Sequence, residues 1–226
     1  MEGESFGEGV VTKFPKSVSM SIDIFFTKCH RCLMDASDSG SRKAAILVAA
    51  WQVFSTYGFR KTSMDDIARE AGMSRPALYR HFRNKEDIYR SLVQRHYDLV
   101  SSQVADCLEG SEAVSDRLTR AFEAQGGEFI KSMLSSPHGA ELLDAGKAMA
   151  GDIVSEGETG LRQIYTDWLV QAESEGRIAI PESAESVALA ISAGLKGLML
   201  LGPDFETYRR SRTVLARLFA DGLNVR

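Results

Sequence analysis

The chain has 226 residues, of which 44% are hydrophobic and 26% charged, a composition typical of globular proteins. This length suits one large domain or two small ones. An odd total of 3 cysteines argues against a disulfide framework and favours a reducing compartment. The N-terminus lacks the pattern of a secretory signal, and no unbroken apolar run has the length of a membrane span. We therefore expect a cytoplasmic protein without a membrane-spanning helix.

Charge is distributed unevenly along the chain. The net charge is −4, but residues 41–100 carry 11 basic and 6 acidic side chains, while residues 101–226 carry 12 basic and 19 acidic ones. An acidic protein is repelled by nucleic acid, so a basic block in one segment indicates that this segment does the binding. A window of this charge also arises by chance, and charge alone does not decide the question.

Residues 1–40 are rich in Gly and Ser and show no persistent helical period, which predicts a flexible extension. An apolar patch at residues 22–26 is compatible with a strand or a docked segment. Cys29 and Cys32 resemble half of a zinc site, but a closed site needs four ligands, so we expect neither a metal nor a cofactor. The internal Met34 further suggests that natural translation starts there.

Two short helices joined by a tight turn are predicted within residues 62–82. Ser63 is a good N-cap with Asp66 as its capping-box partner, and Gly72 follows where a helix often ends with positive φ. Ser74 then caps a second helix, and Pro76 lies in its first turn, where a missing N–H is harmless. A preceding helix is predicted from residue 42 to 57. Together these elements form a helix-turn-helix pattern.

The remaining sequence also predicts helices. Asn84 is expected to cap a long helix ending at Gly110. Further helices are predicted at residues 115–135 with a break at Gly126, at 137–148, 160–175 and 181–201, and from Asp204 to about 221. The predicted fold class is all-α, with a flexible extension (1–40), a helix-turn-helix DNA-binding domain (41–90) and a helical ligand-binding and dimerisation domain (91–226).

Several short motifs in the helix-turn-helix segment fall in register with a known family. They are Ala50-x-x-x-Phe54, Gly58-Phe59, Thr62-Ser63, Ile67-Ala68-x-x-Ala71-Gly72-Met73-Ser74, Leu78-Tyr79-x-His81-Phe82 and Lys85-x-x-Ile88. The segment from residue 42 to about 92 thus resembles the DNA-binding domain of tetracycline-repressor-type (TetR family) regulators. The resemblance implies a homodimer that binds palindromic double-stranded operator DNA and usually represses transcription. It also implies a small-molecule effector in the C-terminal domain that shifts the two DNA-reading heads.

Hydroxyls and guanidinium groups dominate the predicted DNA face. Thr62 and Ser63 open a helix whose N-terminal amides suit a phosphate, although Ser63 is equally explained as a cap alone. Arg75 and Arg80 have forks that match guanine O6 and N7, and the alternative is a phosphate contact or, for Arg80, a solvated face. Pro76 and Ala77 suit a thymine methyl.

The resemblance adds roles to this set. Positions matching Arg75, Pro76, Ala77 and Arg80 often face bases, and those matching Tyr79, His81 and Lys85 often hold phosphates. For His81 the alternative is a satisfied histidine at a helix C-terminus, where the dipole favours its charge. The predicted DNA-binding residues are Thr62, Ser63, Ser74, Arg75, Pro76, Ala77, Tyr79, Arg80, His81 and Lys85.

A stripe of small residues near the C-terminus predicts a close helix contact. Ala190, Gly194 and Gly197 fall at i, i+4 and i+7, and Gly inside a helix is costly unless a backbone approaches closely. With Leu198, Leu215 and Phe219 they form the predicted dimer interface. The alternative is packing within one chain.

A Met and aromatic set is the candidate effector site: Phe122, Phe129, Met133, Met149, Tyr165 and Trp168. An apolar pocket suits a hydrophobic or amphipathic effector, but such a stripe is more often core. No nucleophile elbow accompanies the scattered Ser, His and Asp residues, so we expect no enzyme activity. The rival interpretation is a helical small-molecule binding or enzymatic protein whose basic head does not bind DNA.

Overall fold

The computed structural model describes residues 38–202 and 204–223, and within these ranges all regular structure is helical, which confirms the predicted fold class. The helices are α2 (Asp38–Tyr57), α3 (Met64–Glu70), α4 (Arg75–Tyr79), α5 (Lys85–Leu108), α6 (Val114–Gln125), α7 (Glu128–Ser135), α8 (Gly139–Ser174), α9 (Ala184–Leu201) and α10 (Phe205–Gly222). The predictions for the apolar patch at 22–26, for Cys29 and Cys32, for Met34 and for the extension up to residue 37 lie outside the described residues.

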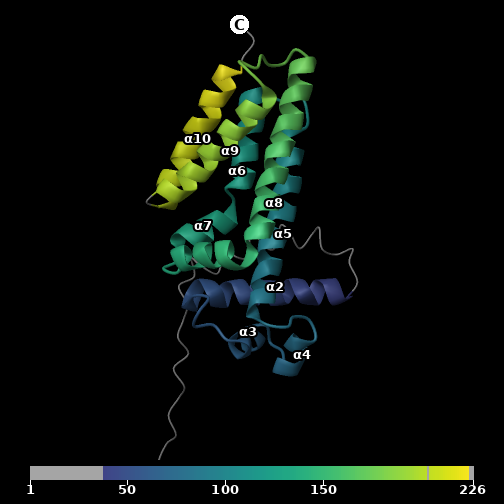
Figure 1. Ribbon diagram of the computed structural model, residues 1–226, viewed down its shortest axis with the longest axis vertical. Coiled ribbons are helices and arrows are strands. Elements are labelled where there is room, and N and C mark those ends of the chain that lie inside the picture. The colour runs from purple at the N-terminus through teal and green to yellow at the C-terminus, as the bar shows by residue number, and fades with distance from the viewer. Residues whose placement is uncertain (1–37, 203, 224–226) are drawn as a thin grey trace, which may run out of the picture.

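The molecule is elongated, with α3 and α4 at one end (Figure 1). We call α2, α3, α4 and the start of α5 the head, and the remaining helices the body. The two long helices α5 and α8 run along the length of the molecule and pack against each other. Helices α6, α9 and α10 gather at the end opposite the head, and α7 lies between (Figure 1).

Local signals in the sequence set the helix boundaries of the head. Ser63 caps α3 in a reciprocal capping box with Asp66. Ser74 accepts a hydrogen bond from the Ala77 amide at the start of α4, and the Asn84 side chain accepts one from the Asp87 amide at the start of α5. Gly72, between the two short helices, has φ +63, which glycine adopts without strain. These features are as predicted.

The core of the head is built from apolar residues of α2, α3, α4 and α5, and it continues into the body. Phe54, Ile67 and Leu78 are completely buried, and they belong to the same cluster as Leu142 and Ala150 of α8. The packing therefore crosses the predicted domain boundary at residue 90. The division into residues 41–90 and 91–226 stays a prediction.

One long helix replaces two predicted short ones. The helices expected at 137–148 and 160–175 both lie in α8, where non-helical angles at Ala150 (φ −134, ψ 26) kink the helix close to the predicted end of the first, and the second begins well before residue 160. The linking residues contain Gly157, and a Cβ built there would overlap the ring of Tyr97. A tertiary contact thus requires glycine inside a helix, where propensity alone predicts a break. The predicted break at Gly126 is confirmed, because α6 ends before it and α7 begins after it.

Candidate nucleic-acid interface and cavities

Helix α4 presents a row of polar side chains to solvent at the tip of the head (Figure 1). Arg75, Pro76 and Arg80 are exposed, and Tyr79 is 43% exposed. Leu78, in the middle of the same helix, is completely buried and fixes which side of α4 faces outward. This is the arrangement that a recognition helix needs, with an apolar anchor inward and hydrogen-bonding groups outward.

Arg75 is held in place before any ligand arrives. Its Nη1 lies 3.1 Å from Oδ2 of Asp65 on α3, and its guanidinium lies 5.5 Å from the centre of the Tyr79 ring. Its other terminal nitrogen donates a 3.4 Å hydrogen bond to the Tyr79 hydroxyl, which is the main reason why the pKa of Arg75 is raised. Arg75, predicted to read a base, and Tyr79, predicted to bind a phosphate, are therefore brought together.

The two predicted cap residues stand at the exposed starts of α3 and α4. The Ser63 hydroxyl donates to Oδ2 of Asp66 at 2.6 Å, and this bond, together with the Ser63 amide, lowers the pKa of Asp66. Ser74 is also exposed, while His81 and Ala77 are half-buried. The structural role of Ser63 as a cap is confirmed, and its contact with DNA stays a prediction.

Thr62 does not fit the phosphate-binding role expected of its hydroxyl. The residue is only 3% exposed, and its Oγ1 donates a 2.7 Å hydrogen bond to the Gly58 carbonyl oxygen. The hydroxyl proton is thus used inside the head. Thr62 closes the turn between α2 and α3 rather than contacting a ligand.

Lys85 also departs from its expected role. Its Nζ donates to the carbonyl oxygens of Phe59 (2.8 Å), Arg60 (3.1 Å) and Thr62 (2.9 Å), and it lies 4.6 Å from the centre of the Phe59 ring. An ammonium group has three protons, and all of them are used by the chain itself. We correct the prediction of a phosphate contact: Lys85 closes the turn at residues 58–62.

The body holds the same turn from the other side, through contacts that the sequence analysis missed. Oε1 of Glu141, in the first turn of α8, accepts a 2.8 Å hydrogen bond from the Arg60 amide. The Ser136 hydroxyl donates to the carbonyl oxygen of Ser55 at 2.8 Å. Further along, Arg90 of α5 forms a two-pronged ion pair with Asp152 of α8 and lowers the pKa of Asp152 to about 2. The position of the head relative to the body therefore depends on these contacts with α8 and the residues before it.

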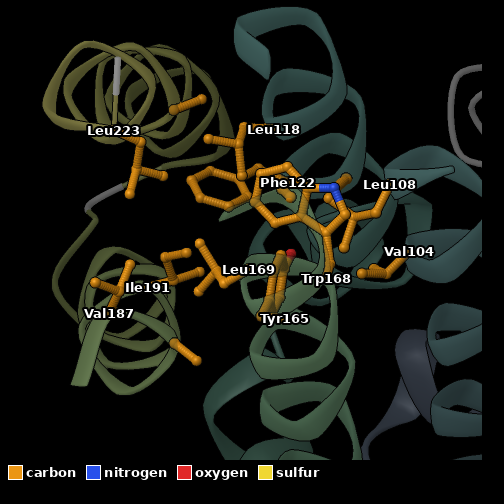
Figure 2. Close-up of a cluster of buried hydrophobic side chains, with 14 of the residues drawn as sticks. Val104, Leu108, Leu118, Phe122, Tyr165, Trp168, Leu169, Val187, Ile191 and Leu223 are labelled. Carbon is orange, nitrogen blue, oxygen red and sulfur yellow. The ribbon is translucent and has the colours of Figure 1, made fainter. Parts of the chain in front are cut away.

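The residues predicted to bind an effector form the core instead. Figure 2 shows Phe122, Tyr165 and Trp168 packed among aliphatic side chains of α5, α6, α8 and α9 and beside Leu223, which follows α10. Phe129 stacks on His96 with ring centres 4.3 Å apart, and Met133 and Met149 pack into the core of the head. Large apolar side chains fill the interior because burying them stabilises the fold. Trp168 also lines a cleft where α5 and α8 end, whereas none of the other five lines a described cavity.

A cavity of about 310 Å³ lies elsewhere, between α5, α8 and α9, with contributions from α6, α7 and α10. None of the six predicted effector residues lines it. Its walls include Leu161, Leu195 and Met199, together with the charged side chains of Arg162 and Lys196. Side chains from six helices meet here, which no periodicity within one helix reveals.

The predicted dimer residues divide into two groups. Gly194 faces α10 of its own chain, because a Cβ built there lies 2.9 Å from Cδ2 of Leu215. Phe219 packs partly against the core of the body. In contrast, Ala190 is exposed, and a Cβ on Gly197 meets nothing within 4 Å. For Gly194 and Leu215 the intrachain alternative describes the observed contact, and Leu198 is half-buried.

Exposed apolar side chains surround this second group. Leu189, Leu200 and Leu201 of α9 and Val214 and Leu218 of α10 are each 50% exposed or more. By length and composition α9 is also apolar enough to cross a membrane, and only 28% of it is buried inside the chain. The α9–α10 face is therefore a large apolar surface, of a kind that marks an interaction site.

The fold and the exposed recognition helix define a helix-turn-helix regulator, and comparisons with known proteins agree. Residues 46–92 match the sequence model described as bacterial regulatory proteins, tetR family. The chain is 31% identical over 174 residues to the HTH-type transcriptional regulator EthR of Mycolicibacterium smegmatis, covering 75% of this chain and 77% of that protein. It is 40% identical over 83 residues to the HTH-type transcriptional activator FasR of the same species, covering 37% and 38%.

The solved structure of a transcriptional regulator from Cytophaga hutchinsonii has the same fold, with a TM-score of 0.67 at 17% identity over 80% of this chain and 97% of that one. The chain belongs to the TetR family of bacterial regulatory proteins and is a DNA-binding transcriptional regulator. Membership in this family favours a regulator over the rival interpretation, a helical small-molecule binding or enzymatic protein whose basic head does not bind DNA.

Proposed function

We propose that this regulator is a repressor that binds a palindromic operator as a homodimer and leaves it when a small amphipathic molecule enters the body. The observation that carries the proposal is the pre-formed row of Arg75, Tyr79 and Arg80 on the solvent side of α4. Because a regulator of transcription acts on the chromosome, the protein works in the cytoplasm.

In the proposed complex α4 lies in the major groove. Arg75 and Arg80 read guanine edges, and Pro76 and Ala77 contact thymine methyl groups. Phosphates are held by Tyr79, His81 and the Ser74 hydroxyl, and at Ser63 by the N-terminal amides of α3, because the Ser63 hydroxyl itself donates to Asp66. Thr62 and Lys85 are excluded from this set because their polar protons are used within the head.

The α9–α10 face is the proposed dimer interface. Leu189, Leu201, Val214 and Leu218 project from it into solvent, and a groove of about 270 Å³ that includes Ala190 and Leu218 runs between the two helices. A two-fold interface brings the same face of two copies together and buries these side chains. The two heads then stand on one side of the dimer, as a palindromic operator requires.

The effector site is the cavity between α5, α8 and α9 (about 310 Å³). Leu161, Leu195 and Met199 offer an apolar wall, and Arg162 and Lys196 offer positive charge beside it. Lys196 is paired with Glu158 at 2.7 Å, whereas Arg162 has no carboxylate within ion-pair distance among the residues that the structure describes. An amphipathic molecule with a polar or anionic end suits this lining.

Helix α8 links the cavity to the head. Its second half lines the cavity through Glu158 and Leu161, and its first turn holds the Arg60 amide through Glu141. The kink at Ala150 lies between these two parts. A ligand that moves the second half of α8 therefore changes how the turn at residues 58–62, and with it α3 and α4, is held.

Arg75→Ala and Arg80→Ala test the DNA-reading role. In competition electrophoretic shifts across single-base operator variants, each variant should lose discrimination at one base pair per half-site, about 1–3 kcal/mol, because a bidentate guanine contact is removed. Tyr79→Phe should weaken every sequence equally, since it removes a phosphate donor. Glu70→Gln, on the exposed end of α3, is the matched control. Uniform weakening by both arginine variants would remove the base-reading role.

Light scattering on size-exclusion peaks tests the dimer. The wild-type protein should elute as a dimer, and Leu218→Glu should shift it to the monomer, because a charge is placed in an apolar interface. Leu218 is 64% exposed in the single chain, so the substitution leaves the monomer fold intact. A wild-type protein that elutes as a monomer at all concentrations would contradict the proposal.

A further inference from the structure

A second cleft, of about 400 Å³, lies where α5 and α8 end and α6 begins. These helix ends are at the end of the body opposite α3 and α4 (Figure 1). The cleft shares no lining residue with the proposed effector cavity. Arg117 and Arg177 line it, together with Trp168 and the exposed carboxylates of Glu109 and Asp167.

Arg117 is the most unusual side chain in this cleft. It is only 1% exposed, yet its Nε has no hydrogen-bond partner among the described residues. A buried guanidinium N–H without an acceptor is costly, because that group has lost its hydrogen bonds to water and gained none in return. Burial and the neighbouring charge of Arg177 both lower the pKa of Arg117, while Glu112 and Glu175 oppose them. Arg117 and Arg177 therefore lie close together, and the positive charge of each is unfavourable for the other.

Two more buried donors in the same cleft lack an acceptor. They are Nη1 of Arg177 and Nε1 of Trp168. Figure 2 shows the Trp168 ring in the core of the body with its nitrogen on the side where Leu108 lies, and Leu108 also lines the cleft. The carboxylate of Glu175 accepts from Nε of Arg177 at 2.5 Å and from the Gln171 side-chain amide at 2.9 Å, but it accepts no hydrogen bond from any of the three unpartnered donors.

Three unpartnered donors, from two helices and a loop, thus belong to residues that line one cleft. Native structures rarely leave buried donors unpaired, and a group of them in a cleft indicates a missing acceptor. The carboxylates of Glu109 and Asp167 are exposed and solvated, so they set the charge of the rim rather than serve the buried donors.

We propose that this cleft binds the anionic group of a small molecule, a carboxylate or a phosphate, through Arg117, Arg177 and Trp168. Oxyanions accept several charge-assisted hydrogen bonds at once, which matches two guanidinium groups and an indole N–H. The site is separate from the proposed effector cavity and from the DNA-binding face. The cleft would therefore be a second ligand-binding site of the regulator, at the end of the body far from the head.

A competing explanation assigns Arg117 a purely structural role. Helices α5 and α8 both end near the cleft, and a cation near helix C-termini is favoured by their dipoles. This explanation accounts for the charge of Arg117 but not for the unpaired donors of Arg177 and Trp168. The two explanations make different predictions for added anions.

The test uses the full chain and measures thermal stability in sodium phosphate, sodium acetate and sodium chloride at matched ionic strength. Phosphate or acetate should raise the melting temperature in proportion to the logarithm of its concentration, and chloride should not. A response to phosphate alone assigns a phosphate ligand, and a response to acetate alone assigns a carboxylate. Equal responses support an anion site that accepts both.

Variants then locate the response. Arg117→Met keeps a side chain of similar length in an apolar surrounding, and Trp168→Phe keeps the ring but removes the N–H. In isothermal titration each should weaken the anion by about tenfold or more relative to wild type. Arg120→Met is the matched control, because Arg120 follows on the same helix but pairs with Glu112 outside the cleft. Its anion affinity should be unchanged.

A wild-type melting temperature that responds equally to all three salts would overturn the proposal, as would an unchanged anion affinity in both Arg117→Met and Trp168→Phe. If Arg117→Met is destabilised and no anion specifically stabilises the wild-type protein, Arg117 has only a structural role. If Arg117→Met does not fold, Trp168→Phe and Arg177→Gln decide. Operator binding by these variants is measured in parallel, so failure of this site is distinguished from failure of the proposed repressor function.

Discussion

The head and the far end of the body each place a cation below the surface, and they do so in opposite ways. In the head, the ammonium of Lys85 donates to three carbonyl oxygens of one turn. At the far end, Arg117 is more deeply buried and its Nε has no acceptor among the described residues. A buried cation whose hydrogen bonds are complete is part of the fold, whereas one with open hydrogen bonds indicates an external partner.

Removal of the Lys85 ammonium should have the largest effect. Lys85→Ala leaves the carbonyl oxygens of Phe59, Arg60 and Thr62 without their shared donor, which should lower the free energy of unfolding by about 2–3 kcal/mol. Urea denaturation followed by circular dichroism measures this. Lys85→Arg should not restore stability, because a planar fork cannot reach three converging oxygens as an ammonium does.

Lys61→Ala is the matched control, since Lys61 lies exposed in the same turn. It should change stability by less than about 0.5 kcal/mol. An unchanged stability of Lys85→Ala, combined with weaker operator binding and a salt dependence reduced by about one phosphate contact, would return Lys85 to the DNA-binding set.

The contrast between Lys85 and the helix caps also shows what the sequence predicts. Ser63, Ser74, Asn84 and Asp204 were predicted correctly because a cap and its partner lie within three residues of each other. The acceptors of Lys85 lie 23 to 26 residues away, and only the folded head brings them to it. The family resemblance predicts which helix carries the DNA face. It cannot show which cations of that segment already donate their hydrogen bonds within the chain.

The body was harder to predict for the same reason. Two helices were expected where α8 is continuous apart from the kink at Ala150, and it passes through Gly157, which packs against the Tyr97 ring. The apolar residues chosen as effector ligands were large and regularly spaced, which are properties of core residues. Both cavities are lined by side chains from several helices, and the polar ones, Arg162 and Arg117, carry no local signal of their role.

Acid should weaken the body through His96. Burial lowers the pKa of His96 to about 4, from its ordinary value of 6.5. Between these values the unfolded chain binds a proton that the folded chain does not, so stability is complete above pH 6.5 and falls as the pH drops towards 4. The ring is partly open to the effector cavity, and we expect a loss of about 2 kcal/mol from this group.

His96→Phe should remove this part of the pH dependence while keeping the stack on Phe129. Urea denaturation at neutral and acid pH measures it, with His81→Gln, a half-buried histidine of the head, as the matched control. Equal slopes of unfolding free energy against pH in wild type and His96→Phe would mean that His96 is protonated as readily in the folded chain as in the unfolded one.

The smallest effect on stability is expected at the DNA face, where Arg75 is exposed to solvent. The side chains of Arg75 and Asp65 are 58% and 53% exposed, and an exposed pair of this kind contributes less than about 1 kcal/mol to stability. Asp65→Asn should therefore leave the unfolding free energy nearly unchanged. It should tighten operator binding by about twofold, because Arg75 is released and a negative charge near the phosphates is removed.

A double-mutant cycle separates these two causes. If release of Arg75 matters, the gain from Asp65→Asn should disappear in the Arg75→Ala background, whereas a general charge effect should persist there and should also be seen in Glu70→Gln. Weaker operator binding by Asp65→Asn would show instead that the ion pair orients Arg75 for DNA. Arg75 would then resemble Lys85, because its position would be set by a contact within the chain. The geometry of a cation's contacts, and not its exposure, would then distinguish a cation that belongs to the fold from one that is available to DNA.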